Sequence, residues 1–465
     1  MKSVISIFII VFSLSLLNAQ ERPNVVFIVV DQWSTRIVDG SGDYANGIET
    51  PNIDKLASEG MRFENSYSSF PLCCPARASF YTGLMPHNHG LVDNEEIYHH
   101  TIGELPIKQD AKTMGEIFKE NGYNTAFFGK EHAGGYGWRG IDNFGSMKYT
   151  GGGMLGEGSA YDPVFTSDAA EFIQQEHNKP FYLTLSLINP HDICKVLGGK
   201  LKGASYADAI FFCRDDSEPY LRFQERPQLP ENHSVEYVDG MIDSNDYMFK
   251  DLADRTETEW RQYIATYQLL MENTDRQVGH VLKAIKDSGL EDNTLVIFTA
   301  DHGEMMGSHG LIAKTIFYEE SAKTPLIIKY PSKIEAQTDD NTSFVGSVDL
   351  LPTMLDFCGI ESSTDFDGKS FKANCTGSAG GFDYVFSENF NGRMVRFGDY
   401  KYIISQFGDE EYRILFDLKN DPDETTNVYH HTDYKKISKQ AHKVLSGWME
   451  KEGLGNYFVR DYIKM

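Results

Sequence analysis

The fold is decided by the stretch VVFIVVD at residues 25–31. Six apolar residues in a row, without polar alternation, are typical of a strand that is buried on both faces, as in a parallel sheet. The run ends at Asp31-Gln32, and ligands of α/β sheets bind at the carboxyl ends of the strands. Asp31 is therefore a candidate binding residue, and capping of the next element is the ordinary alternative.

Three further apolar runs also end in residues that bind metals or anions. They are residues 125–128 before Gly129-Lys130-Glu131-His132, residues 181–188 before Asn189-Pro190-His191-Asp192, and residues 294–300 before Asp301-His302-Gly303-Glu304. One such ending is ordinary, but four with complementary chemistry favour a common site at one edge of a sheet. We therefore predict an α/β fold with a large mixed, mostly parallel sheet sandwiched by helices.

The clearest helix signal lies between the last two of these strands. Thr256 and Glu259 have the spacing of a capping box. Apolar residues then recur at helical spacing as far as Ile285, and we expect this stripe to be core that covers one face of the sheet rather than a cofactor site. A second amphipathic helix is predicted over residues 113–121.

Residues 193–250 form a long excursion that is rich in charge, aromatic residues and turn formers. We expect it to lie over the strand ends, because loops on a rigid scaffold carry specificity. A passive surface insertion is the alternative.

The pattern changes in the last third of the chain. A hairpin is predicted at residues 393–405, followed by a strand at 413–418 and a closing helix. We therefore expect a catalytic domain at residues 20–335 and a smaller C-terminal α+β subdomain at residues 336–465, with a small antiparallel sheet.

A chemical signal comes from the stretch CCPARASFYTG at residues 73–83. Pro75 suits the first turn of a helix, where a missing N–H group is no loss. A nucleophile just before a helix start lies beside free N–H groups and the positive end of the dipole, which favour anionic ligands. Arg77 adds a planar cation that matches a tetrahedral oxyanion. The stretch predicts a nucleophile facing a sulfate- or phosphate-like group; the alternative is a structural cysteine pair, although adjacent cysteines hardly bridge each other.

The pattern C-x-P-x-R followed by x-x-x-x-T-G resembles the signature of the type I, formylglycine-dependent sulfatases of the alkaline phosphatase superfamily. In that family the first cysteine is oxidised to formylglycine during export. The resemblance thus implies that a maturation enzyme modifies Cys73, and it points to a bacterial polysaccharide sulfatase. Further segments that resemble the family are Gly129-Lys130-Glu131-His132, Asn189-Pro190-His191, Asp301-His302-Gly303-Glu304, His309-Gly310 and Lys314.

The resemblance also implies one bound divalent cation. Its expected ligands are Asp31, Gln32, Asp301, His302 and the modified Cys73. Calcium fits oxygen-rich ligation, whereas an imidazole ligand also suits transition metals. Many relatives carry two aspartates at the first pair of positions and Asp-Asn at the second. The departures at Gln32 and His302 leave the ligand set and the substrate open.

The catalytic residues that the resemblance implies are Cys73, Arg77, Lys130, His132, His191 and Lys314. Hydrated formylglycine is a geminal diol, and one ionised hydroxyl attacks sulfur while the lysines and His191 hold the sulfate oxygens. His191 or His132 protonates the leaving alcohol oxygen. The second hydroxyl then loses its proton, which expels sulfate and regenerates the aldehyde. Each lysine also has the ordinary alternative of a solvated surface residue.

Residues 1–19 predict a secretory signal. Lys2 precedes the apolar run 4–17, and Leu17-Asn18-Ala19 is a plausible cleavage site. The run is short for a membrane span of about 20 apolar residues. We therefore expect an exported protein, periplasmic or secreted, without stable membrane insertion. The formal charge of −25 argues against nucleic acid and anionic membranes as partners.

The chain has six cysteines, and an even number permits disulfides in an exported protein. If Cys73 is modified, at least one of the others stays unpaired. Cys194 with Cys213 is the one pair that we expect.

The expected function is hydrolysis of sulfate esters of a sulfated carbohydrate partner, such as ulvan or carrageenan oligosaccharides or a glycosaminoglycan. Two alternatives stay open. One is a phosphonate or phosphate ester hydrolase on the same site, which the residues Gln32 and His302 leave open. The other is a catalytically inactive carbohydrate-binding homologue, which requires that Cys73 stay a thiol or that the metal site be empty.

Overall fold

The structure, a computed structural model, describes residues 22–35, 48–94, 108, 110–145, 158–196, 227–242, 255–378 and 381–454. The predicted signal at residues 1–19 and most of the excursion at residues 193–250 lie outside the described residues. Within the described ranges no helix has the length and apolar character needed to cross a membrane.

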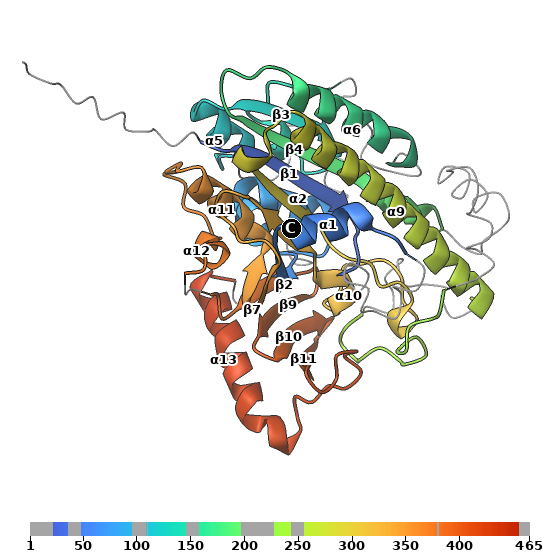
Figure 1. The fold of residues 1–465 in the computed structure, drawn as a ribbon. Coiled ribbons are helices and arrows are strands. Elements are labelled where there is room, and N and C mark those ends of the chain that lie inside the picture. Colours follow the sequence, from blue (N-terminus) through green and yellow to red (C-terminus); the bar gives the residue numbers. More distant parts are fainter. Residues whose placement is uncertain are drawn as a thin grey trace, which may run out of the picture.

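A seven-stranded sheet forms the centre of the fold (Figure 1). Its strands, from one edge to the other, are β3 (Asn124–Gly129), β4 (Phe181–Pro190), β1 (Asn24–Asp31), β5 (Thr294–Ala300), β6 (Leu326–Lys329), β2 (Met61–Tyr67) and β7 (Thr338–Gly346). β1 pairs in parallel with both β4 and β5, and β3 pairs in parallel with β4. The strands predicted from the four apolar runs are therefore neighbours, and their carboxyl ends meet at one edge.

β6 makes the sheet mixed, because it runs antiparallel to both β5 and β2, whereas β2 and β7 are parallel. The predicted α/β fold with a mixed, mostly parallel sheet is confirmed. We expected the domain boundary at residue 335. β7 begins after that residue, and it still belongs to the large sheet, where it pairs with β2.

Helices cover both faces of this sheet (Figure 1). Alternate residues of β1 divide between two apolar cores, so that Val26 and Ile28 face one core and Val25 and Phe27 face the other. The first core is shared with α1 (Pro51–Glu59), α6 (Gly158–Gln174) and α9 (Glu257–Asp287), and the second with α2 (Cys73–Thr82), α5 (Met114–Glu120) and α11 (Leu350–Phe357).

Both helices predicted at residues 113–121 and from Thr256 onward are present. α9 begins after Thr256, whose hydroxyl oxygen accepts the N–H of Glu259 while the Glu259 carboxylate accepts the N–H of Thr256. α5 begins with the same reciprocal pair of hydrogen bonds. The sequence did not predict α6, because several of its buried positions hold polar or small residues, such as Asp162 and Thr166, which weaken the apolar pattern.

A smaller antiparallel sheet follows in the chain. Its strands are β8 (Val385–Glu388), β9 (Gly392–Phe397), β10 (Tyr400–Phe407) and β11 (Glu410–Asp417), in the order β11-β10-β9-β8. Helix α13 (Lys435–Lys451) packs on it through Ala441 and Leu445. The predicted hairpin, third strand and closing helix are therefore present. The short helices are α3 (Pro86–His89), α10 (Glu319–Ala322), α12 (Lys372–Cys375) and the 3-10 helices Tyr136–Trp138, His191–Val196, Glu291–Asn293, Ser308–Gly310, Ser347–Asp349 and Thr432–Tyr434.

The expected disulfide between Cys194 and Cys213 is contradicted at Cys194, which is a free thiol. Cys213 lies outside the described residues. The Cys194 sulfur lies 3.5 Å from Oε1 of Gln32 and 3.7 Å from Nε2 of His191, so its position next to β1 and β4 directs it toward the strand ends.

Candidate active site and metal centre

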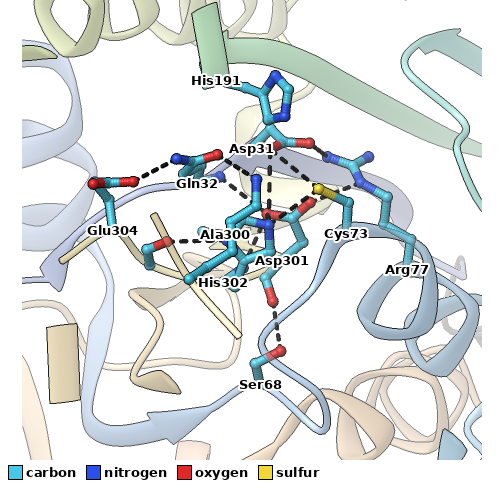
Figure 2. A network of polar contacts seen from close by, with 12 residues as sticks. Asp31, Gln32, Ser68, Cys73, Arg77, His191, Ala300, Asp301, His302 and Glu304 are labelled. Atoms are coloured by element: carbon cyan, nitrogen blue, oxygen red, sulfur yellow. Dashed lines mark hydrogen bonds and ion pairs between the residues drawn. The ribbon is translucent and has the colours of Figure 1, made fainter. Parts of the chain in front are cut away.

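Side chains from three separate segments meet at the carboxyl ends of β1 and β5 (Figure 2). Asp31 ends β1, Asp301 and His302 follow β5, and Cys73 begins α2. One ligand atom from each of these four residues lies within 4.8 Å of all the others, and the four side chains are buried. The structure thus brings together the aspartate, cysteine and histidine residues that we expected to bind a cation.

Cys73 is the first residue of α2, with Leu72 as the N-cap. The thiol therefore lies within the first turn of the helix, not just before it as we expected, and Pro75 occupies the third helical position. The Cys73 sulfur lies 3.2 Å from Nε2 of His302 and 3.8 Å from Oδ1 of Asp31. An anion at this position still gains from the positive end of the helix dipole.

Arg77 joins the two buried carboxylates. Its Nη2 lies 2.9 Å from Oδ2 of Asp31, and its Nε lies 2.8 Å from Oδ2 of Asp301. The remaining nitrogen, Nη1, donates to the carbonyl oxygen of Lys130 at 3.1 Å and to the hydroxyl of Ser186 at 2.6 Å. Each guanidinium nitrogen therefore has a protein acceptor, and Arg77 orients the two aspartates.

The ring of His302 has a defined orientation. Its Nδ1 lies 3.0 Å from the carbonyl oxygen of Gly303. A carbonyl oxygen only accepts hydrogen bonds, so Nδ1 carries a proton and the neutral ring presents the lone pair of Nε2 to the cluster. That tautomer is the one a metal ligand at this position needs.

The donor set fits a divalent cation. Arg77 takes the Oδ2 atom of each aspartate, and the Oδ1 atoms of Asp31 and Asp301 lie 3.9 Å and 3.6 Å from Nε2 of His302. Carboxylate oxygens are the ligands that Ca²⁺ prefers, while the imidazole is also compatible with a transition metal.

Two buried lysines flank this cluster. Nζ of Lys130 lies 2.7 Å from Oδ2 of Asp31, and Nζ of Lys314 donates to Oε1 of Gln32 at 2.5 Å. Burial by itself lowers the pKa of each lysine, but anionic neighbours outweigh it, chiefly Asp31 for Lys130 and Cys73 for Lys314, so both pKa values are raised. Only 2% of Lys130 and 4% of Lys314 is exposed, so neither is a solvated surface lysine.

The two candidate histidines differ in charge. Burial lowers the pKa of His191, but the Cys194 thiolate and then Asp31 outweigh it and raise that pKa to about 10. Burial, reinforced by the positive charge of Lys130, lowers the pKa of His132 to about 4. At neutral pH His191 is therefore protonated and His132 is neutral.

Gln32, the fifth expected ligand, has its amide engaged by its neighbours. Its backbone has a left-handed φ of 68°. Its Nε2 donates to Oε2 of Glu304 at 2.5 Å and its Oε1 accepts from Nζ of Lys314 at 2.5 Å, while the Cys194 sulfur lies 3.5 Å from the same Oε1. In the structure the amide oxygen thus meets Lys314 and Cys194.

Comparison with known proteins identifies the family of this site. Residues 23–360, more than half of the 465 residues, match the sulfatase family. The chain belongs to the sulfatase family. Residues 307–451 of this sulfatase also match the C-terminal family of N-sulphoglucosamine sulphohydrolase. The protein is therefore a sulfatase family hydrolase.

Similar sulfatases extend over nearly the whole chain. A Delta 4,5-hexuronate-2-O-sulfatase of Bacteroides thetaiotaomicron is 30% identical over 457 residues, which cover 93% of this chain and 90% of that protein. An ulvan-active sulfatase of Formosa agariphila is 25% identical over 472 residues, covering 95% of this chain and 83% of that protein. Among solved structures, a 2-O GAG sulfatase matches with a TM-score of 0.78 and 28% identity, covering 96% of this chain and 94% of that one.

The sequence did not assign a role in the site to two tyrosines that hold it in place. Tyr263 donates its hydroxyl to Oε1 of Glu304 at 2.7 Å, and Tyr267 donates to the carbonyl oxygen of Gln32 at 2.5 Å. Tyr267 belongs to the stripe that we predicted as core. A signal was nevertheless present, because two tyrosines four positions apart lie on the same side of a helix and carry a polar group at the end of an apolar ring.

Proposed function

We propose that this sulfatase is exported and removes sulfate esters from a sulfated carbohydrate, with formylglycine at position 73 and one bound calcium ion. The substrate class is supported by relatives that are named for hexuronate 2-O-sulfate, ulvan and glycosaminoglycan activity. Sulfated oligosaccharides of glycosaminoglycans, ulvan and carrageenan are therefore the substrates to test.

The single observation that supports the proposal is the surrounding of the Cys73 sulfur. That atom stands where the nucleophilic oxygen of the modified residue would lie, 3.2 Å from Nε2 of His302 and 3.8 Å from Oδ1 of Asp31. Burial by itself raises the pKa of the Cys73 thiol, but the buried cations Lys314 and Lys130 help to outweigh it, so that this pKa is lowered. A site with this charge favours an anionic nucleophile and an anionic ester together.

The metal ligands in this proposal are Asp31, Asp301 and His302, with residue 73. Calcium held by these residues would supply positive charge, and that charge would favour ionisation of the hydroxyl. Arg77 keeps both aspartates in place, because it forms one ion pair with each of them.

The remaining side chains handle the ester and the protons. Lys130 and Lys314 hold the sulfate oxygens, whose charge changes as the S–O bond breaks. His191 donates a proton to the leaving alcohol oxygen, because it is the histidine that is protonated at neutral pH. His132, which is neutral and interacts with the Cys73 sulfur, is suited to accept the proton of the second hydroxyl.

The proposal is tested in two steps on protein exported from a host that matures sulfatases. Mass spectrometry of the tryptic peptide at residues 63–77 should show loss of the Cys73 thiol and gain of an aldehyde. Release of inorganic sulfate is then measured with sulfated oligosaccharides, and phosphate and phosphonate monoesters serve as the comparison. An unmodified thiol contradicts the mechanism, faster cleavage of a phosphorus ester favours a phosphonate or phosphate ester hydrolase, and binding of saccharide without turnover favours an inactive carbohydrate-binding homologue.

A further inference from the structure

Glu304 is buried beside the cluster, with 0% of its surface exposed, and its carboxylate is surrounded by hydrogen-bond donors. Its Oε1 accepts from the hydroxyl of Tyr263 and the N–H of Ala313, both at 2.7 Å, and from the N–H of Met306 at 3.3 Å. Its Oε2 accepts from Nε2 of Gln32 at 2.5 Å (Figure 2). Each oxygen thus has its own set of donors.

These contacts fix the two ends of the Gln32 amide. A carboxylate offers only acceptors, so Gln32 must turn its NH₂ group toward Glu304. The amide oxygen then lies on the other side, where Nζ of Lys314 donates to it at 2.5 Å. An ammonium group offers only donors. The opposite orientation of the amide would therefore place its NH₂ group against Lys314 and its oxygen against the Glu304 carboxylate.

The backbone of Gln32 is held independently of this amide. Its N–H donates to Oδ1 of Asp301 at 3.0 Å, and its carbonyl oxygen accepts the hydroxyl of Tyr267 at 2.5 Å. The orientation of the amide is therefore left to the side chains around it, with Glu304 at one end and with Lys314 and the Cys194 sulfur at the other. Rotation of an amide by half a turn changes no shape, so only the pattern of donors and acceptors can select one orientation.

We propose that Glu304 is a positioning residue that sets the orientation of the Gln32 amide and thereby directs its oxygen toward Lys314. The inference rests on the proposed function, because Lys314 is assigned there to the sulfate oxygens. The same orientation is needed if the Gln32 oxygen binds the cation, since calcium takes oxygen ligands.

The variant Glu304→Gln tests this with almost no change in shape. Its amide oxygen should take the place of Oε1, where Tyr263 and Ala313 donate, and its NH₂ group should then face Gln32. Gln32 must turn over to offer its oxygen, so its own NH₂ group meets the ammonium of Lys314. We expect the contact between Lys314 Nζ and Gln32 to lengthen beyond about 3.5 Å, which is no longer a hydrogen bond. We also expect kcat/KM to fall by about 10-fold to 100-fold.

A reciprocal exchange is the sharper test. Gln32→Glu alone sets two carboxylates against each other and should also lose activity. In the double variant Gln32→Glu with Glu304→Gln, the new amide donates to one oxygen of the new carboxylate, and Lys314 donates to the other. We expect kcat/KM of the double variant to be about 10-fold higher than the value obtained by multiplying the two single effects, because residues in contact show coupling of this size.

Tyr263→Phe is the matched control. It removes one hydrogen bond from the other oxygen of Glu304 and leaves the bond to Gln32, so its loss should be clearly smaller than that of Glu304→Gln. If Tyr263→Phe loses as much kcat/KM as Glu304→Gln, then any disturbance around Glu304 lowers activity, and the inference is overturned. An unchanged Glu304→Gln enzyme, or a double variant no better than the product of the singles, overturns it as well.

Two readouts separate this inference from the proposed function. Crystal structures of the parent and of Glu304→Gln report the contact between Lys314 and Gln32, and calorimetry reports the affinity for inorganic sulfate, which we expect to fall about 10-fold in the variant. Neither readout requires turnover. If the parent protein releases no sulfate from any ester but the contact breaks as expected, the proposed function fails and the positioning by Glu304 stands. If the parent is active and both readouts are unchanged, the positioning fails alone.

Discussion

The sulfur of Cys73 lies 3.2 Å from Nε2 of His302, although 229 positions separate the two residues in the chain. The first turn of α2 carries the sulfur, and the segment after β5 carries the ring. The contact places the proposed nucleophile against the metal ligands, so modification, metal binding and catalysis should depend on the same few atoms.

Loss of the nucleophile should abolish turnover, whereas loss of its neighbour should not. Cys73→Ala should lower kcat by about 10⁴-fold or more, as removal of a nucleophile does in other hydrolases. Cys74→Ala is the control, because Cys74 packs in the core between the sheet and α2. Sulfate release by the two purified variants is compared, and equal activity of both would contradict the assignment of Cys73.

Calcium should stabilise the folded protein through the two aspartates. After chelation, calcium at about 100 times its dissociation constant should add about 2.7 kcal/mol to the free energy of unfolding, because it binds the folded state alone. Thermal unfolding with and without calcium measures this. Asp31→Asn should lose the effect, whereas Asp340→Asn, which changes a carboxylate that accepts hydrogen bonds within its own turn, should keep it. A calcium effect of the same size in Asp31→Asn would contradict the proposed site.

The alkaline limit of activity should depend on Cys194. Burial opposes a charge on His191, but the Cys194 thiolate helps to raise its pKa to about 10. If His191 acts as the general acid, kcat/KM is lost as the pH rises through that pKa. Cys194→Ser removes the negative charge, so the pKa of His191 falls and the alkaline limb of the pH profile should move to lower pH.

The control for this shift is Cys358→Ala, a buried cysteine in the core on the opposite side of the sheet from α9. Its pH profile should match that of the parent. An alkaline limb that stays in place in Cys194→Ser would mean that another group supplies the proton.

Lys401 should contribute strongly to stability, because it links the small sheet to the segment after β5. It is fully buried, and its Nζ lies 2.6 Å from Oε1 of Glu319 and 2.7 Å from Oε1 of Glu424. Lys401→Met removes the buried cation that Glu319 and Glu424 share, so the free energy of unfolding should fall by about 3–5 kcal/mol.

Urea unfolding measures the effect of this substitution. The exposed Lys419 gives the matched variant Lys419→Met, which should change the free energy of unfolding by less than about 0.5 kcal/mol. A similar small change in Lys401→Met would show that the buried ion pairs gain little over their cost of desolvation.

The sequence by itself was enough to predict the four neighbouring parallel strands and the residues at their ends. Each continuous apolar run is a local signal of a strand buried on both faces, and Asp31, Lys130, His191 and Asp301 follow directly from where the runs stop. The capping box at Thr256 was also sufficient to locate the start of α9, because its hydrogen bonds join residues only three positions apart.

Only the tertiary structure decided how the site is completed. The antiparallel insertion of β6, the hydrogen bond that Gln32 donates to Glu304, and the contact of Lys314 with the same amide join segments that are far apart in the chain. The different protonation states of His191 and His132, one charged and one neutral, depend on burial and on neighbours from other segments. Local patterns carry no information on these distances. Burial and electrostatic interaction depend on the position of every neighbour in space, so the charge and orientation of the site residues follow only from the folded arrangement.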